Sequence, residues 1–174
     1  GRLPVQLDVV KNYELLLNPE EIDAYSYSWG NPEFINDRLQ MVVLIEPKYP
    51  RDWALYHGKL YIDNERLSFT RIELSLDMSD RDKATRTMLV RKPIGVRFKP
   101  RELTCVVDYR YADGVTRISY LRNIFKFNCD WKKRLFSTSF TATCEMAVTD
   151  RQTENVQPIV SRNSFDSRDS YYDK

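Results

Sequence analysis

The sequence predicts a mainly β protein, built as a curved antiparallel meander sheet (a LolA-like half-barrel) with one or two short helices as cover. Three observations predict it. Asp113-Gly114 lies between two stretches rich in aromatic and β-branched residues, which is a strong hairpin signal. Residues 134–149 alternate strictly between apolar and polar. Aromatic residues make up 13% of the 174 residues, while glycine is scarce.

The first half of the chain supplies a short helix and four strands. Asn18 is a suitable cap for a helix over 18–25, with Pro19 at its first position. A strand follows from Tyr25. Segments 39–47, 54–62 and 67–77 are the next predicted strands, and the continuous apolar run of 39–47 favours a buried central position.

One predicted strand changes its apolar face part of the way along. In 67–77, Leu67 and Phe69 have odd numbers, whereas Ile72, Leu74 and Leu76 have even numbers. A β-bulge near Thr70-Arg71 would reconcile the two parities. The alternative is a strand that is covered on both faces.

Residues 78–90 have the best helical propensity of the chain, with Ser79 or Asp80 as the cap. The following segment, 91–102, has two prolines and one glycine among five basic residues, so we expect a loop or an edge segment.

The hairpin around Asp113-Gly114 predicts a register. Counting back from the turn pairs Tyr109 with Ile118, Val107 with Tyr120, and Leu103 with Ile124 on an apolar face. Arg110 then lies opposite Arg117 on a polar face. The second strand continues through Phe125, Phe127, Cys129 and Trp131, again with a change of parity.

The domain organisation follows from composition. Residues 1–150 form a single antiparallel β domain, and 151–174 form an irregular C-terminal tail, because few apolar residues there can anchor it. The chain begins Gly1-Arg2 without a methionine, as a trimmed or cleaved chain would, and no transmembrane stretch occurs in it.

Inward-facing aromatic residues are the candidate ligand-binding residues. A concave sheet lined by them has room for a lipid or another apolar molecule, although the same residues also suit a plain core. The candidates are Tyr25, Tyr27, Trp29, Phe69, Tyr109, Tyr120, Phe136 and Phe140. Trp53 and Trp131 are alternative contact points for a partner or a membrane surface.

Catalytic and metal chemistry finds little support. His57 is the single histidine, and no Gly-x-Ser-x-Gly motif accompanies it. The loop "DMSDRD" has three aspartates but lacks the glycine of a calcium loop. Cys105, Cys129 and Cys144 have no metal-site spacing and are expected to be buried free thiols. We therefore expect no enzyme, no metal and no cofactor.

The net charge also limits the partners. It is only +2, from 27 basic and 25 acidic residues, which argues against a dedicated nucleic-acid binder.

Several segments resemble a known family. "YHGKLYIDNERLSFTRIELSLDM", "LLNPEEIDAYSYSWG", "KPIGVRFKPREL" and "CDWKKRLFSTSFTATCEMAVTDR" are similar to exported Bacteroidetes proteins that carry an upstream carboxypeptidase-like regulatory domain. Residues 58–63, "GKLYID", also resemble a hairpin of LolA-like periplasmic lipoprotein carriers. The first resemblance implies a periplasmic or outer-membrane-associated location, and the second implies a concave face that holds acyl chains.

Three hypotheses follow. The chain is a non-catalytic exported module of the cell envelope that binds a lipid or another apolar ligand on the concave face. Alternatively, it is a structural or protein-interaction domain of an outer-membrane-associated protein with no small ligand. The third is an unrecognised hydrolase, which requires a cleft with converging carboxylates.

Overall fold

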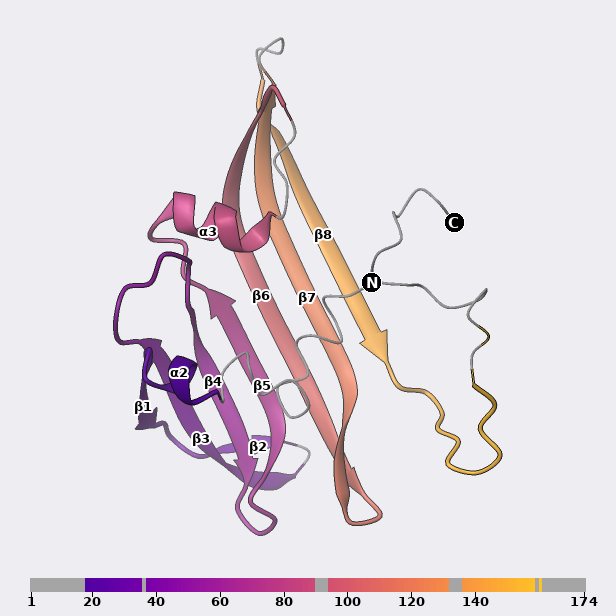
Figure 1. Cartoon of the computed structure of the whole chain (residues 1–174). Coiled ribbons are helices and arrows are strands. Elements are labelled where there is room, and N and C mark those ends of the chain that lie inside the picture. Colours follow the sequence, from indigo (N-terminus) through magenta and orange to yellow (C-terminus); the bar gives the residue numbers. More distant parts are fainter. Residues whose placement is uncertain (1–17, 36, 90–93, 132–135, 159, 161–174) are drawn as a thin grey trace.

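A computed structural model describes residues 18–35, 37–89, 94–131, 136–158 and 160. Its centre is one open antiparallel sheet of eight strands (Figure 1), in the spatial order β1-β3-β4-β5-β6-β7-β8 with β2 also paired to β3. The predicted mainly β meander is therefore confirmed, and the open sheet is consistent with a half-barrel. The strands are β1 (Tyr25–Trp29), β2 (Glu33–Ile35), β3 (Arg38–Pro47), β4 (Tyr56–Asp63), β5 (Ser68–Leu76), β6 (Val96–Ala112), β7 (Val115–Trp131) and β8 (Thr138–Ala147).

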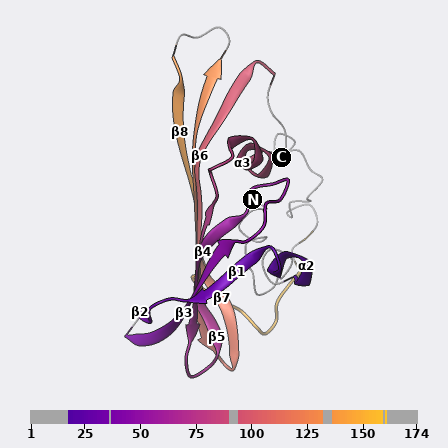
Figure 2. The ribbon, with the colours of Figure 1, turned by 90° about the vertical axis from the view of Figure 1, so that its left-hand side faces the viewer.

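Both described helices lie on the same side of the sheet (Figure 2). They are α2 (Pro19–Ile22) and α3 (Arg81–Met88), which begin close to the predicted positions. Asp80 caps α3, because its carboxylate accepts hydrogen bonds from the backbone N–H groups of Asp82 and Lys83, both at 3.0 Å. We call this side of the sheet the core face and the opposite side the polar face.

The hydrophobic core lies on the core face in two clusters. The larger one includes Ile45, Ile72, Val107 and Leu121, all fully buried, and so it crosses from β3 to β7. The smaller one forms under α3, where Ala84 packs with Leu76 and Leu103. Alternation along each strand sends these side chains to one face, as in a sheet with one solvated side.

The β-bulge predicted in the fifth strand is confirmed. Tyr61 pairs with Arg71 and Ile62 with Phe69, which leaves Thr70 as the extra residue of β5. The Thr70 hydroxyl donates a 2.7 Å hydrogen bond to Oε1 of the buried Gln40 on β3. The bulge therefore has its own polar anchor and allows both halves of β5 to face the core.

The long hairpin of β6 and β7 turns where predicted. Asp113 and Gly114 both have positive φ, at 54° and 77°, as a two-residue hairpin turn of this kind requires. The register up to Tyr109–Ile118 and Arg110–Arg117 is also as predicted.

Beyond Ile118 the predicted register is wrong. Asp108 pairs with Tyr120, so Ser119 is an extra residue, and Val107 then pairs with Leu121 and Leu103 with Phe125. The Ser119 hydroxyl donates to the Asp108 carbonyl oxygen at 3.1 Å. One inserted residue reverses the faces of all that follow. This bulge explains the change of parity along β7 and places Tyr120 on the polar face.

The segment 91–102 is more ordered than expected for a loop, because β6 begins at Val96. Pro100 is tolerated there because β5 pairs only with residues 104–108 of β6, so this stretch has a free edge where no N–H is needed. A second register shift follows at Arg101.

Residues 151–158 contain no strand or helix and are exposed, in line with the predicted tail. Residues 161–174 and the apolar lead-in 3–17 lie outside the described residues.

Candidate functional site

An apolar groove on the core face is the strongest candidate site. It lies between the end of α3 and the upper parts of the three last strands, and it has a volume of about 240 Å³. Its lining is entirely apolar, apart from one thiol: Met88, Leu89, Val96, Phe98, Phe125, Phe127, Cys129 and Ala142. Concave apolar sites of this kind hold apolar ligands or the side chains of a partner.

Four aromatic rings extend the groove across β6, β7 and β8; we call them the aromatic ladder (Phe98, Phe127, Trp131 and Phe140). The ring centroids of Phe98 and Phe127 are 5.0 Å apart, and Phe127 stacks on Phe140 at 5.2 Å. Trp131 meets Phe140 edge-on at 6.2 Å. These distances lie in the range where aromatic pairs attract each other beyond the effect of burial. The ring of Phe140 is partly exposed, so the ladder is open to solvent.

The structure separates the eight predicted ligand-binding residues. Tyr25, Phe69 and Tyr109 belong to the larger core cluster. Tyr27 lies 6.5 Å from Tyr25 but is exposed, and Trp29 is 72% exposed.

The remaining three lie apart from that cluster. Phe140 is in the aromatic ladder, while Phe136, before β8, is 81% exposed. Tyr120 lies on the polar face, where its hydroxyl donates a 2.7 Å hydrogen bond to Glu145, so its predicted inward orientation is wrong. Strand order and stagger thus divide the eight among the core, the ladder and the solvent.

Phe98, Phe125 and Phe127 form much of the groove and were missed as a set. The signal for the second strand was present in the odd-numbered run from Phe125 to Trp131. The missing information was the pairing of Phe98 with Cys129 and of Phe127 with Phe140, which depends on the two register shifts in β6–β7.

The polar face carries a network of charged side chains at β2, β4 and β5. Lys59 Nζ contacts Glu33 Oε1 at 2.7 Å, and this hydrogen bond lowers the pKa of the Glu33 carboxyl. The Tyr61 hydroxyl lies 3.3 Å from carboxylates of both Glu33 and Glu73. Burial, followed by the charges of Glu73 and Glu33, raises the pKa of Tyr61 to about 12. Ionised carboxylates and a protonated phenol favour cross-linking of strands over acid catalysis.

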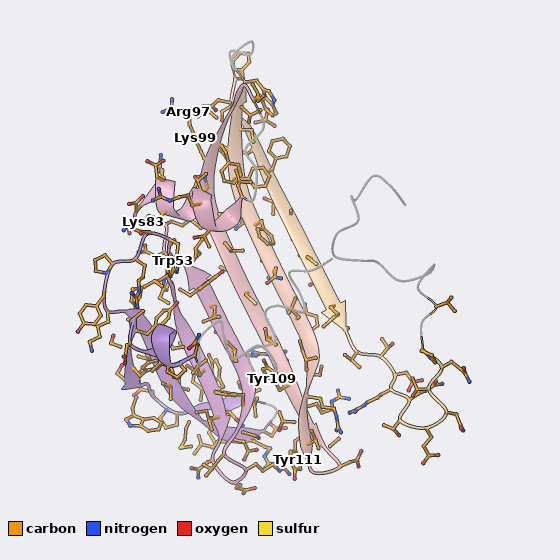
Figure 3. The ribbon with its side chains drawn as sticks, in the orientation of Figure 1. Trp53, Lys83, Arg97, Lys99, Tyr109 and Tyr111 are labelled. Carbon is orange, nitrogen blue, oxygen red and sulfur yellow. The ribbon has the colours of Figure 1, made fainter. Side chains whose placement is uncertain are left out.

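A second polar cluster closes the turn between β4 and β5. The buried Asp63 accepts hydrogen bonds from the backbone N–H groups of Glu65 and Arg66 at 2.9 and 3.0 Å, and Arg38 Nε lies 3.3 Å from its other oxygen. Burial alone would raise the pKa of Asp63, but these hydrogen bonds and the two guanidinium groups hold it below its usual value. Arg66 in turn covers the ring of Tyr111 at 4.5 Å from its centroid, at the end of the hairpin shown in Figure 3.

The remaining catalytic and metal candidates gain no geometry. His57 lies opposite Ser75 in the β4–β5 ladder, and its imidazole makes no hydrogen bond within the described part of the chain. Asp77 and Asp80 accept hydrogen bonds from residues of the turn and of α3. Among residues 18–160 apart from the undescribed positions, no group of three or more His, Cys, Asp or Glu could hold a metal ion.

The three cysteines are free: Cys105 and Cys129 are buried, as expected, whereas Cys144 is exposed on β8.

Comparisons with protein-family models, with curated proteins and with solved structures find no match for this chain. None of the described helices is long and apolar enough to cross a membrane.

Proposed function

We propose that this chain is a non-catalytic, exported module of the bacterial cell envelope that binds an apolar group, such as part of an acyl chain, in the groove beside α3. The observation that carries the proposal is the groove itself: eight lining residues without a charged or amide side chain, next to an aromatic ladder that is open to solvent. The resemblance to exported Bacteroidetes proteins and to LolA-like carriers supports the location and the class of ligand.

The dimensions of the groove limit what it can hold. Its volume of about 240 Å³ is smaller than the roughly 300–1,000 Å³ of most small-molecule pockets. The groove therefore suits one segment of a lipid, with the rest lying along the aromatic ladder, and does not suit a fully enclosed lipid.

A second candidate function is protein interaction through β8. This strand lies at the edge of the sheet, and most of its ten residues are exposed. Its sequence, TSFTATCEMA, lacks the lysines and prolines that usually protect edge strands. An extended segment of an envelope protein could add to it as a further strand, with its apolar side chains on the ladder.

A displacement assay with a fluorescent fatty acid tests the first function. Ala142→Phe places a large side chain in the groove from an exposed strand, so we expect it to abolish binding. Thr141→Phe is the matched control, since Thr141 is the neighbouring residue of β8 and faces the opposite side. Equal binding by both variants, or none by the unmodified chain, would remove the lipid proposal.

A pull-down from envelope extracts separates the second function from the first. If β8 recruits a partner strand, Thr143→Pro removes a backbone donor at the edge and should abolish capture while the fatty acid still binds. Capture that is unchanged in this variant argues against the edge-strand function.

A further inference from the structure

The end of the β6–β7 hairpin near α3 projects beyond the rest of the sheet. The last residue pair between β5 and β6 is Ser75–Thr104, whereas β6 begins at Val96, opposite Trp131. At about 3.3 Å per residue, this end extends roughly 25 Å past the last β5–β6 pair. Figure 1 shows β6, β7 and β8 narrowing to this end, away from β1 and β2.

Two large apolar side chains are exposed at this projecting end. Ile94, just before β6, is fully exposed, and Phe136, just before β8, is 81% exposed. They lie next in sequence to strands that carry the aromatic ladder, so they continue an apolar surface that is already open. Single exposed apolar residues are common, but a continuous group of them marks a contact surface.

Positive charge is concentrated at the same end. Arg97 is exposed, and Lys99 follows it on the same face, where its Nζ contacts Asp130 at 2.6 Å. Figure 3 shows Arg97 and Lys99 together there, far from Tyr109 and Tyr111 at the opposite end of the hairpin. In sequence, residues 90–102 and 127–140 contain eight of the 27 basic residues and only two of the 25 acidic ones.

We infer that this end, which we call the basic tip (Ile94, Arg97, Lys99 and Phe136), docks on the surface of an anionic lipid bilayer. Arginine and lysine attract anionic headgroups, and each contributes about a fivefold gain in binding near such a surface. Exposed isoleucine and phenylalanine side chains enter the boundary between headgroups and acyl chains. A nucleic acid would use the same positive charge but offers no apolar layer for Ile94 and Phe136, so the combination favours a bilayer.

This inference does not require the groove to hold a ligand, although docking would bring the groove close to the membrane. Sedimentation with vesicles tests it, comparing pure phosphatidylcholine with a mixture of two parts phosphatidylcholine and one part phosphatidylglycerol. We expect binding to the mixed vesicles only. Binding should weaken as salt rises from about 0.1 M to about 1 M, because the Debye length falls from about 10 Å to about 3 Å.

Charge variants on one strand locate the contact. Arg97→Gln should weaken binding about fivefold, and Arg97→Glu about 25-fold, because it changes the charge by two. Arg110 is the matched control, since it is also exposed on β6 but lies at the other end of the hairpin. Arg110→Glu should leave vesicle binding unchanged, and an equal loss in both variants would overturn the assignment to the tip.

An apolar variant tests the insertion. Phe136→Ser should reduce binding at least about tenfold, from the loss of one buried aromatic side chain. Phe34→Ser is the control, because Phe34 on β2 is similarly exposed, at 74%.

Three results would overturn the inference: equal binding to neutral and anionic vesicles, no binding to either, or displacement from vesicles by a short DNA duplex at low concentration. All these variants change exposed side chains, so an unchanged urea unfolding curve shows that each one is folded.

Discussion

Gly58 of β4 is a position where one methyl group should destabilise the whole sheet. It lies between Ile45 of β3 and Leu74 of β5. A Cβ atom there would overlap the carbonyl oxygen of Glu73, and would lie 2.9 Å from the Glu73 carbonyl carbon and 3.1 Å from the Leu74 Cα. All three are backbone atoms, so no side-chain rotation relieves the overlap.

The magnitude follows from what has to move. To accommodate Gly58→Ala, β4 and β5 must separate at this pair, which weakens the local ladder. Each lost hydrogen bond reduces stability by about 0.5–1.5 kcal/mol, and overpacking adds about 1–3 kcal/mol. We therefore expect the free energy of unfolding to fall by about 2–4 kcal/mol.

Urea unfolding followed by tryptophan fluorescence measures this change. Gly30→Ala is the control, because a Cβ atom at Gly30 meets only side-chain atoms of Val42 and Leu44, at 3.1–3.3 Å. Those side chains can adjust, so its effect should stay near or below about 1 kcal/mol. If Gly58→Ala unfolds at the same urea concentration as Gly30→Ala, with the same slope, the close approach of β4 and β5 is not as described.

Three further predictions concern the core, the polar face and the thiols. Leu121→Ala should lower the free energy of unfolding by about 2–5 kcal/mol, because Leu121 is fully buried, whereas Leu39→Ala at an exposed site should change it by less than about 0.5 kcal/mol in urea unfolding. The pKa of Asp63 is lowered in the folded state, so its contribution is complete above the unfolded value of about 3.9 and is lost as the pH falls through the folded pKa. The stability difference between the unmodified chain and Asp63→Asn should therefore shrink on acidification from neutral pH, and a constant difference would contradict this. Burial raises the pKa of Cys105 to about 12, so a thiol reagent at mildly alkaline pH should label the exposed Cys144 in the native state and Cys105 only in urea; equal labelling rates would be inconsistent with the fold.

Some features were predictable because they depend on neighbours in the sequence. The turn at Asp113-Gly114 needs two residues that tolerate positive φ, and the cap of α3 needs a carboxylate at Asp80. The bulge at Thr70 was visible because apolar residues change parity within one strand. In each of these cases the decisive interaction spans a few residues.

Other features were not predictable because they depend on two strands at once. The extra residue at Ser119 shifts the register between β6 and β7, and so it sends Tyr120 to the polar face and Phe127 to the core face. The start of β6 within a proline-containing segment depends on the free edge that β5 leaves beside Pro100. A pattern in one strand does not contain the position of its partner.

The sequence by itself determined a mainly β meander, its principal turns and which residues are apolar, since turn chemistry and alternation are local. Only the tertiary structure decided how the aromatic residues are grouped. It buried Tyr25, Phe69 and Tyr109 in the core, left Trp29 exposed, and brought Phe98, Phe127 and Phe140 from three strands together beside α3. The physical reason is that side chains from different strands meet only through register and stagger, which long-range pairing sets.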